Sequence, residues 1–324
     1  MSLTIKIEHT GGPEVMQLVD ETVAAPGAGQ LRVRHAAIGL NFIDVYHRSG
    51  VYKLSLPSGL GSEAAGTVTA VGSGVSGFAA GDRIAYVGGP LGAYSQERLL
   101  PAVNALKLPP GVSEESAAAL MLKGMTAWYL LHQTFPVRPG HTLLVHAAAG
   151  GVGSILVPWA KHLGATVIGT AGSPDKAEAA RRAGCDQVIL YREQDFAAEV
   201  RKLTDGKGVD VAYDSVGKDT FAGSLDSLCR RGTLVTFGNA SGKVPPFEPV
   251  LLSEKGSLFL TRPRLADYTA TREELETAAN GLFEAIAKGV VKAEVGQRYP
   301  LREVARAHAE LQARQTTGAS LLLP

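Results

Sequence analysis

A glycine-rich segment at residues 146–153, HAAAGGVG, has the residue types and spacing of a phosphate-binding turn. It follows a short apolar run at residues 142–145 and precedes a helical-looking segment at residues 154–163. A glycine motif between a strand and a helix is typical of dinucleotide binding, because side chains in such a turn would crowd the pyrophosphate. The new helix also offers unpaired N–H groups and the positive end of its dipole. We therefore expect Gly150, Gly151 and Val152 to bind a dinucleotide; a merely structural strand–helix turn is the alternative.

The end of the next predicted strand indicates which dinucleotide is bound. NAD sites usually carry an acidic residue about 20 residues after the glycines. Here Gly172 is followed by Ser173 and Lys176, whose hydroxyl and cation suit a 2′-phosphate. Asp175 is a counter-signal, although the helix dipole favours an acidic residue in a first turn. Residues 172–176, here called the 2′-phosphate corner, favour NADPH over NADH. The alternative for Lys176 is an exposed lysine on the surface of the helix.

Two further loops follow predicted strands, at residues 214–217 and 237–242. The carboxyl ends of parallel strands form the ligand-binding face of such a sheet. Small residues in both loops would let backbone and hydroxyl groups approach a ribose, a pyrophosphate or a nicotinamide. Ordinary turn chemistry is the alternative reading of either loop alone.

The elements that must position these loops alternate between strand and helix. Strands are predicted at residues 142–146, 166–170, 187–190, 209–213, 233–237 and 257–261, and helices at residues 174–183, 196–204 and 220–228. Six strands with intervening helices predict a Rossmann-type, doubly wound parallel sheet.

The flanking parts of the chain have a different pattern. Residues 1–100 contain short strands separated by Gly and Pro clusters, which suggests a partly open β-barrel or a sandwich. Residues 114–131 are predicted to be helical, with Ser113 as N-cap. Two amphipathic helices, at residues 271–288 and 303–314, and a closing strand at residues 319–323 are predicted near the C-terminal end. We therefore predict a dinucleotide-binding domain, residues 125–265, inserted into a β-rich domain formed by residues 1–124 and 266–324.

Composition limits the class of protein. The 324 residues carry a net charge of +1, which argues against nucleic acid and membrane surfaces as partners. The apolar runs are shorter than a transmembrane span. The two cysteines, Cys185 and Cys229, have no metal-type spacing and indicate reduced thiols in a cytoplasmic protein.

Several segments together resemble the medium-chain dehydrogenase/reductase superfamily. They are residues 39–46, 57–66, 122–127, 146–153, 213–217 and 237–242. Within that superfamily the chain is most similar to the zinc-free NADPH:quinone oxidoreductases, the zeta-crystallin-like branch. The resemblance implies a GroES-like barrel around the Rossmann domain, NADPH as cofactor and a quinone as substrate.

The zinc alcohol dehydrogenases of the same superfamily are the contrast. Their catalytic zinc ligands match Asn41, Ser62 and Lys123 here, and an amide, a hydroxyl and an ammonium do not replace thiolate and imidazole. We therefore expect no metal. A second departure is Pro158, where the family pattern usually has Gln; a proline inside a helix predicts a local bend.

Hydride transfer to a quinone needs little Lewis-acid assistance, since a quinone is already a strong acceptor. The protein then has to place the two reactants and exclude water. We hypothesise that Asn41, Tyr46 and Tyr52 line the acceptor space. Asn41 or Tyr46 would hydrogen-bond the acceptor oxygen or the nicotinamide amide, Tyr52 would form a wall or gate, and protons would come from solvent.

The resemblance implies further cofactor-binding positions. Tyr191 is expected at the adenosine end, residues 262–265 at the nicotinamide, and Arg314 over the cleft. The whole predicted set is Asn41, Tyr46, Thr126, Gly150, Gly151, Val152, Gly172, Ser173, Lys176, Tyr191, Ser215, Phe237, Gly238, Asn239, Ser241, Pro263, Leu265 and Arg314.

The predicted sixth strand, residues 257–261, is apolar and would lie at the sheet edge. An unpaired edge is a template for pairing, so we predict a homodimer formed by two-fold strand pairing. Two other functions stay open. One is an NADPH-dependent reductase of enones or 2-alkenals, and the other is a non-catalytic NADPH-binding structural or RNA-associated protein.

Overall fold

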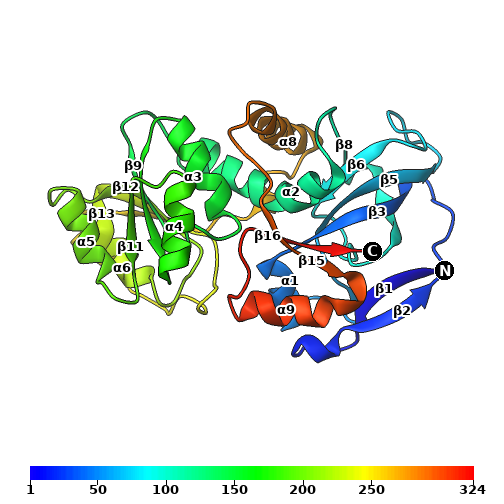
Figure 1. Cartoon of the computed structure of the whole chain (residues 1–324), viewed down its shortest axis with the longest axis horizontal. Helices are drawn as coiled ribbons and strands as arrows, with labels where there is room; N and C mark the ends of the chain where they lie inside the picture. Colours follow the sequence, from blue (N-terminus) through cyan, green and yellow to red (C-terminus); the bar gives the residue numbers. More distant parts are fainter. The chain divides into compact units, whose positions relative to one another are not determined.

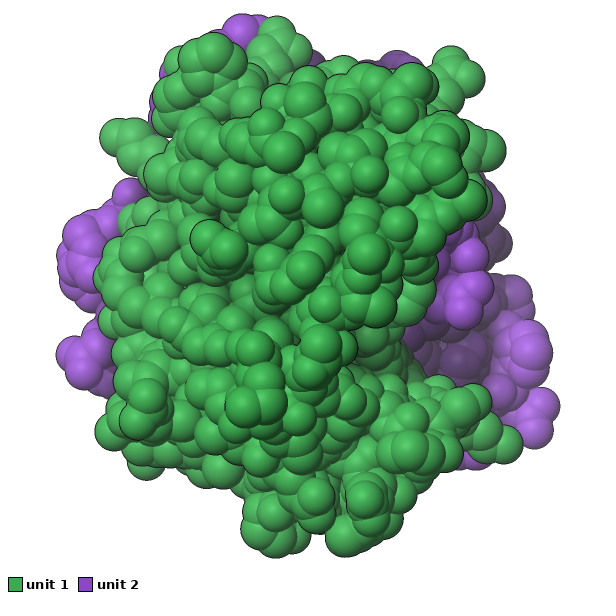
Figure 2. All heavy atoms as spheres, turned by 90° about the vertical axis from the view of Figure 1, so that its right-hand side faces the viewer, with its two compact units in different colours: residues 1–125, 269–287, 292–324 green, residues 126–268, 288–291 purple.

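The computed structural model describes all 324 residues. The chain divides into two compact units (Figure 2). Unit 1 contains residues 1–125, 269–287 and 292–324, and unit 2 contains residues 126–268 and 288–291. The domain boundaries predicted from the sequence stay a prediction.

Unit 2 contains a six-stranded parallel sheet. Its strands are β9 (Thr142–Val145), β10 (Thr166–Ala171), β11 (Gln187–Leu190), β12 (Val209–Asp214), β13 (Leu228–Thr236) and β14 (Phe259–Thr261). Their order is β11-β10-β9-β12-β13-β14, and every neighbouring pair is parallel. The predicted doubly wound sheet is therefore confirmed. The strand order reverses between β9 and β12, where sheets of this kind bind ligands.

Helices cover both faces of this sheet. They are α3 (Gly153–His162), α4 (Pro174–Arg182), α5 (Phe196–Leu203), α6 (Phe221–Ser227) and α7 (Val250–Glu254). In Figure 1, α3 and α4 lie on one side of the sheet and α5 and α6 on the other. Leu143, Leu144 and Val145 are consequently buried on both faces of β9, which explains its continuous apolar run.

Two predicted strand boundaries in unit 2 were wrong. β13 begins at Leu228 rather than at residue 233, because Val209 pairs with Leu228 before the register shifts. Arg231 has a φ of +62° there, so the strand bulges at residues that read as a loop. β14 begins at Phe259 rather than at residue 257, since Ser257 has a φ of +57°. A left-handed residue does not continue an extended strand.

Unit 1 is built from two sheets. The smaller has the order β2-β1-β4, and the larger has the order β15-β16-β3-β5-β6-β8 with β7 also pairing with β3. The strands are β1 (Ser2–Ile7), β2 (Gln17–Glu21), β3 (Gln30–Leu40), β4 (Ser58–Gly59), β5 (Glu63–Val71), β6 (Arg83–Val87), β7 (Glu97–Pro101), β8 (Ala105–Lys107), β15 (Val295–Pro300) and β16 (Ala319–Leu323).

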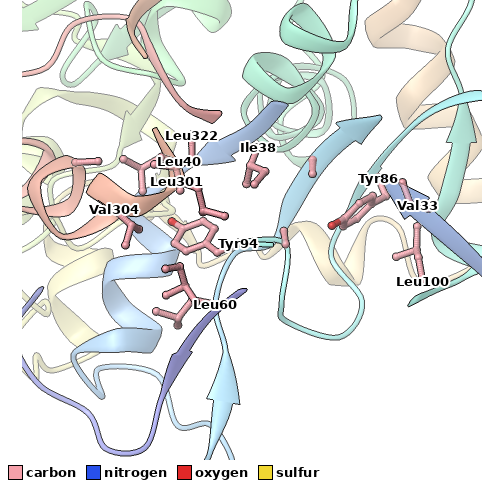
Figure 3. Close-up of a cluster of buried hydrophobic side chains, with 14 of the residues drawn as sticks. Val33, Ile38, Leu40, Leu60, Tyr86, Tyr94, Leu100, Leu301, Val304 and Leu322 are labelled. Carbon is pink, nitrogen blue, oxygen red and sulfur yellow. The ribbon is translucent and has the colours of Figure 1, made fainter. Parts of the chain in front are cut away.

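One long strand organises the larger sheet. The first half of β3 pairs with β7, and its end pairs with β16, where Leu321 lies opposite Gly39. The predicted closing strand at residues 319–323 is thus confirmed. Figure 3 shows the core beside it, in which Tyr94 lies among Leu40, Leu60 and Leu301.

The helices of unit 1 include α1 (Phe42–Arg48), α8 (Arg272–Ala287) and α9 (Val304–Gln312). The predicted helix at residues 114–131 is α2 (Glu114–Tyr129), and a π-helical turn, Leu130–Thr134, follows it. The Ser113 hydroxyl accepts a hydrogen bond from the Ser116 amide at 3.1 Å, as an N-cap does. No helix combines the length and apolarity that crossing a membrane requires.

Candidate cofactor and acceptor site

The glycine turn joins β9 directly to α3, which begins at Gly153. A Cβ atom on Gly153 would lie 2.5 Å from the Ala147 carbonyl oxygen and 2.6 Å from the Ala148 carbonyl oxygen. Ala147 itself has a φ of +51°, a strained conformation for a residue with a side chain. The turn is therefore folded tightly against the start of the helix. This arrangement fits the pyrophosphate of a dinucleotide at the helix N-terminus.

The predicted 2′-phosphate corner lies at the end of β10. A Cβ atom on Gly172 would lie 2.8 Å from the Tyr191 Oη atom, so the glycine admits the tyrosine to the corner. Ser173 is the N-cap of α4, and its hydroxyl accepts a hydrogen bond from the Lys176 amide at 3.4 Å. Gly172, Ser173, Lys176 and Tyr191 thus lie together. The Ser173 oxygen caps the helix while its hydrogen can still be donated to a phosphate.

The loops that follow β12 and β13 pack against each other. Gly238 lies against the Ser215 carbonyl oxygen, where a Cβ atom would clash with backbone. The amide and the hydroxyl of Ser241 both donate to the Val216 carbonyl oxygen, at 2.8 and 2.9 Å. Predicted cofactor residues Ser215, Phe237, Gly238, Asn239 and Ser241 therefore belong to one continuous patch at the carboxyl ends of the strands.

Arg262 connects this patch to the segment after β14, since its Nη1 atom donates to the Gly238 carbonyl oxygen at 2.9 Å. Pro263 is buried and Leu265 is half-buried in that segment. Thr126 lies in α2, and Arg314 follows α9 with a φ of +59°. Cofactor contacts of Thr126, Pro263, Leu265 and Arg314 stay predictions.

In unit 1, the predicted acceptor residues surround α1. The rings of Tyr46 and Tyr52 lie edge to face with their centres 5.2 Å apart. The Tyr52 amide donates to the Tyr46 carbonyl oxygen at 3.1 Å, which fixes the two residues to each other. Asn41 is the N-cap of α1 and is only 4% exposed. Its Nδ2 atom donates to Glu63 Oε1 at 2.7 Å, so its amide nitrogen is already engaged within the protein.

Comparison with known proteins gives the family. An alcohol dehydrogenase GroES-like domain model matches residues 27–110, and a zinc-binding dehydrogenase model matches residues 151–280. The quinone oxidoreductase of Pseudomonas aeruginosa is 53% identical over 325 residues, covering 100% of both chains. The chain belongs to the quinone oxidoreductases of the medium-chain dehydrogenase/reductase family. Its fold is the one that the resemblance implied, a GroES-like domain with a Rossmann-type sheet.

Two further relatives are informative about ligands. The crystal structure of Escherichia coli quinone oxidoreductase complexed with NADPH has a TM-score of 0.97 and 51% identity, and covers 99% of this chain and 100% of that one. The 2-haloacrylate reductase of a Burkholderia species is 49% identical over 331 residues, covering 100% of this chain and 99% of its own.

The family pattern did not reveal the buried polar groups that hold α1. Asp44 is fully buried. It accepts hydrogen bonds from the backbone N–H of Asn41 at 2.9 Å, from Ser62 Oγ at 3.2 Å and from Tyr94 Oη at 2.9 Å. Burial raises the pKa of Asp44 to about 7 in spite of these donors. Tyr94 Oη also lies 3.0 Å from His308 Nε2, which brings α9 into the same cluster.

Hydrogen bonding defines the tautomer of His308. Arg48 can only donate, so at 3.3 Å its Nη1 atom makes His308 Nδ1 the acceptor. His308 Nε2 therefore carries the proton and donates to Tyr94. Burial lowers the pKa of His308 to about 3, consistent with a neutral ring. The cluster fixes the Asp44 carboxyl group at the N-terminus of α1 and joins that helix to α9.

A second missed cluster supports the cofactor loops. His146 begins the glycine turn, and its ring nitrogens lie 2.9 Å from Ser224 Oγ and 3.0 Å from Thr170 Oγ1. Ser224 in turn donates to Asp214 Oδ2 at 3.0 Å. Burial lowers the pKa of His146, whereas the Asp214 charge acts in the opposite direction. The ends of β9, β10 and β12 are therefore joined by one buried network.

No group of three or more His, Cys, Asp or Glu side chains lies close enough to hold a metal ion. Of the positions that match zinc ligands, Asn41 and Lys123 contact Glu63, and Ser62 contacts Asp44. Pro158 lies inside α3, and the bend predicted there stays a prediction.

The 2′-phosphate corner gives a testable prediction. Replacing Lys176 by Met is expected to weaken NADPH binding about tenfold to a hundredfold, because a charge-assisted hydrogen bond is lost. NADH binding should change little, since NADH lacks the 2′-phosphate. Fluorescence titration with both nucleotides measures this. Lys202→Met is the matched control, since this lysine is 77% exposed on α5 and pairs only with Glu199. Equal losses of affinity for NADPH and NADH would show that Lys176 does not bind the 2′-phosphate.

Proposed function

We propose that the chain is an NADPH-dependent quinone oxidoreductase that transfers a hydride to a quinone without a metal. The observation that carries this proposal is the full-length similarity to quinone oxidoreductases, one of them solved with NADPH. The local chemistry supports it, because the corner after β10 offers a hydroxyl and an ammonium and the β10 strand itself ends without a carboxylate.

Different segments of this chain would bind different parts of NADPH and of the acceptor. The turn before α3 would bind the pyrophosphate, and Ser173 with Lys176 would bind the 2′-phosphate. The patch formed by residues 215 and 237–241 would hold the ribose and nicotinamide end. NADPH supplies the hydride when it is bound. Tyr46 and Tyr52 would form an apolar wall that orients a flat acceptor and excludes water.

A reductase of conjugated double bonds is the second candidate. The 2-haloacrylate reductase relative favours it, because that protein is nearly as similar to this chain as the quinone oxidoreductases are. Hydride addition to an activated C=C bond uses the same placement of donor and acceptor.

Consumption of NADPH and NADH with benzoquinone, phenanthrenequinone and 2-hexenal, each with and without chelator, tests the proposal. NADPH-preferring, chelator-resistant turnover of a quinone is the expected result. Turnover of the enal alone would move the chain to the double-bond reductases. Tight NADPH binding without turnover of any acceptor would favour a non-catalytic role. Loss of activity on chelation would contradict metal-free transfer.

We also propose a homodimer formed through β14. This strand lies at the edge of the sheet, and Phe259 on it is 61% exposed. Light scattering is expected to give twice the chain mass of 33.9 kDa. Phe259→Glu should give the monomer mass, because two carboxylates would meet across a two-fold axis. Val103→Glu, at a 67% exposed site in unit 1, is the matched control. A monomeric parent protein at micromolar concentration would rule the dimer out.

We place this activity in the cytoplasm, where the unpaired thiols of Cys185 and Cys229 would stay reduced.

A further inference from the structure

The ammonium group of Lys123 is buried but weakly held. Lys123 lies on α2 and is 7% exposed. Its Nζ atom lies 3.3 Å from the Leu40 carbonyl oxygen and 3.5 Å from Glu63 Oε1, both long for a charged donor. An ammonium carries three hydrogens, so one of them has no acceptor within the protein. A buried cation with a hydrogen to spare is suited to an acceptor oxygen from outside the chain.

Glu63 does not depend on Lys123 for its hydrogen bonds. Its carboxylate is fully buried and accepts short bonds from Asn41 Nδ2 at 2.7 Å and from the Leu122 amide at 2.6 Å. Gly39 is required beside it, because a Cβ atom there would clash with the carboxylate. The carboxylate therefore faces the ammonium from one side, while neutral donors satisfy the hydrogen bonds of the carboxylate. Lys123 is free to offer its charge elsewhere.

The position of this ammonium connects it to the predicted acceptor residues. Leu40 ends β3, Asn41 caps α1, and α1 carries Tyr46 against Tyr52. Several other buried polar groups of the region have their hydroxyl or ring hydrogens engaged within the protein. Ser62 and Tyr94 donate to Asp44, and His308 donates to Tyr94 and accepts from Arg48. Lys123 is the buried cation of this region with a hydrogen that has no acceptor within the protein.

We propose that Lys123 is the proton donor of the reaction, placing its Nζ–H on the acceptor oxygen that becomes negative. This inference rests on the proposed function. The acceptor gains an electron pair with the hydride from NADPH, and one oxygen of the resulting hydroquinone anion takes the proton. The Nζ–H bond breaks, an O–H bond forms, and the neutral amine recovers a proton from water. Before transfer, the same positive charge stabilises the developing oxyanion.

The test compares Lys123→Ala with the parent protein and with Lys107→Met, an exposed lysine of unit 1 that pairs with Asp82. Lys123→Ala should lower kcat with benzoquinone about a hundredfold, the usual effect of losing a general acid. The Kd for NADPH should stay within about twofold. Added methylammonium should restore part of the lost kcat, because it can occupy the vacated volume and carry the same proton.

A binding measurement tests the charge without turnover. The visible absorbance of 4-nitrophenol reports whether this hydroquinone analogue is ionised when bound. Its ionisation midpoint should lie about one pH unit higher in Lys123→Ala than in the parent, since the ammonium favours the phenolate. Should the single variant fail to fold, Lys123→Ala/Glu63→Gln removes the buried carboxylate as well and is read in the same two assays.

A kcat within about threefold of the parent, or no difference in the 4-nitrophenol midpoint, would overturn the assignment. Parallel losses of kcat and NADPH affinity without rescue by methylammonium would also overturn it, because they indicate a structural role. If the parent protein reduces no quinone, the proposed function fails and the step with it. If the parent turns over and Lys123→Ala does so equally well, only the assignment of Lys123 fails.

Discussion

The Gly153→Ala protein is expected to bind NADPH about fivefold to a hundredfold more weakly than the parent, because overpacking a tight turn costs about 1–3 kcal/mol. The new Cβ atom would lie 2.5 and 2.6 Å from two carbonyl oxygens of the glycine turn. Those oxygens belong to backbone that cannot rotate away as a side chain would. Either the turn or the first residues of α3 must move, and both would carry phosphate-binding N–H groups out of position. Isothermal calorimetry with NADPH measures the loss.

Gly27→Ala is the matched control for this substitution. Gly27 is exposed, and a Cβ atom there would meet only the flexible end of Gln30, at 3.3 Å. The same chemical change should therefore leave NADPH affinity unaltered. An unchanged NADPH affinity in Gly153→Ala would show that the turn can accommodate a methyl group. It would weaken the assignment of the turn to pyrophosphate binding.

Asp214→Ala is expected to lower the free energy of unfolding by about 3–5 kcal/mol, because several buried donors lose their shared acceptor. The carboxylate accepts from the amides of Val216 and Gly217 at 2.8 and 3.0 Å, and from the hydroxyls of Thr220 and Ser224 at 2.8 and 3.0 Å. Asp214 is fully buried, so water cannot replace these bonds without entering the core. Urea unfolding measures the change.

The same substitution should weaken NADPH binding, since Ser215 and the loop around it lose the anchor that shapes them. Asp226→Ala is the control, because Asp226 is exposed and pairs only with Lys255 and should cost less than about 1 kcal/mol. A loss of stability in Asp214→Ala no greater than that of Asp226→Ala would mean that the four donors find other partners.

The sequence predicted the sheet of unit 2 well because its signals are local. An apolar run, a glycine turn and an amphipathic helix each lie within about fifteen residues, and burial of both sheet faces explains the pattern. The start of β13 was missed because Arg230, Arg231 and Gly232 read as a loop. Pairing with β12 imposes strand structure there, around a bulge that no local pattern predicts.

The glycine turn and the corner after β10 could be predicted because their chemistry lies in consecutive residues. The buried networks could not, since their partners are distant in sequence. Tyr94 reaches Asp44 across 50 residues and His308 across 214 residues. The match of Asn41, Ser62 and Lys123 to zinc ligand positions identified the region. It did not reveal that Glu63 lies between Asn41 and Lys123, which changes what both side chains can do.

The pairing of β16 with β3 determines when the larger sheet of unit 1 can be completed during synthesis. Leu40 and Ser320 are neighbours in the sheet, so this pair cannot form until the 279 residues between them have been synthesised. Every strand of unit 2 is synthesised between them. The parallel sheet can therefore assemble while the last residues of β3 still lack their neighbour β16 on one edge. Until β16 is synthesised, this edge of β3 is an unpaired template for pairing with another chain.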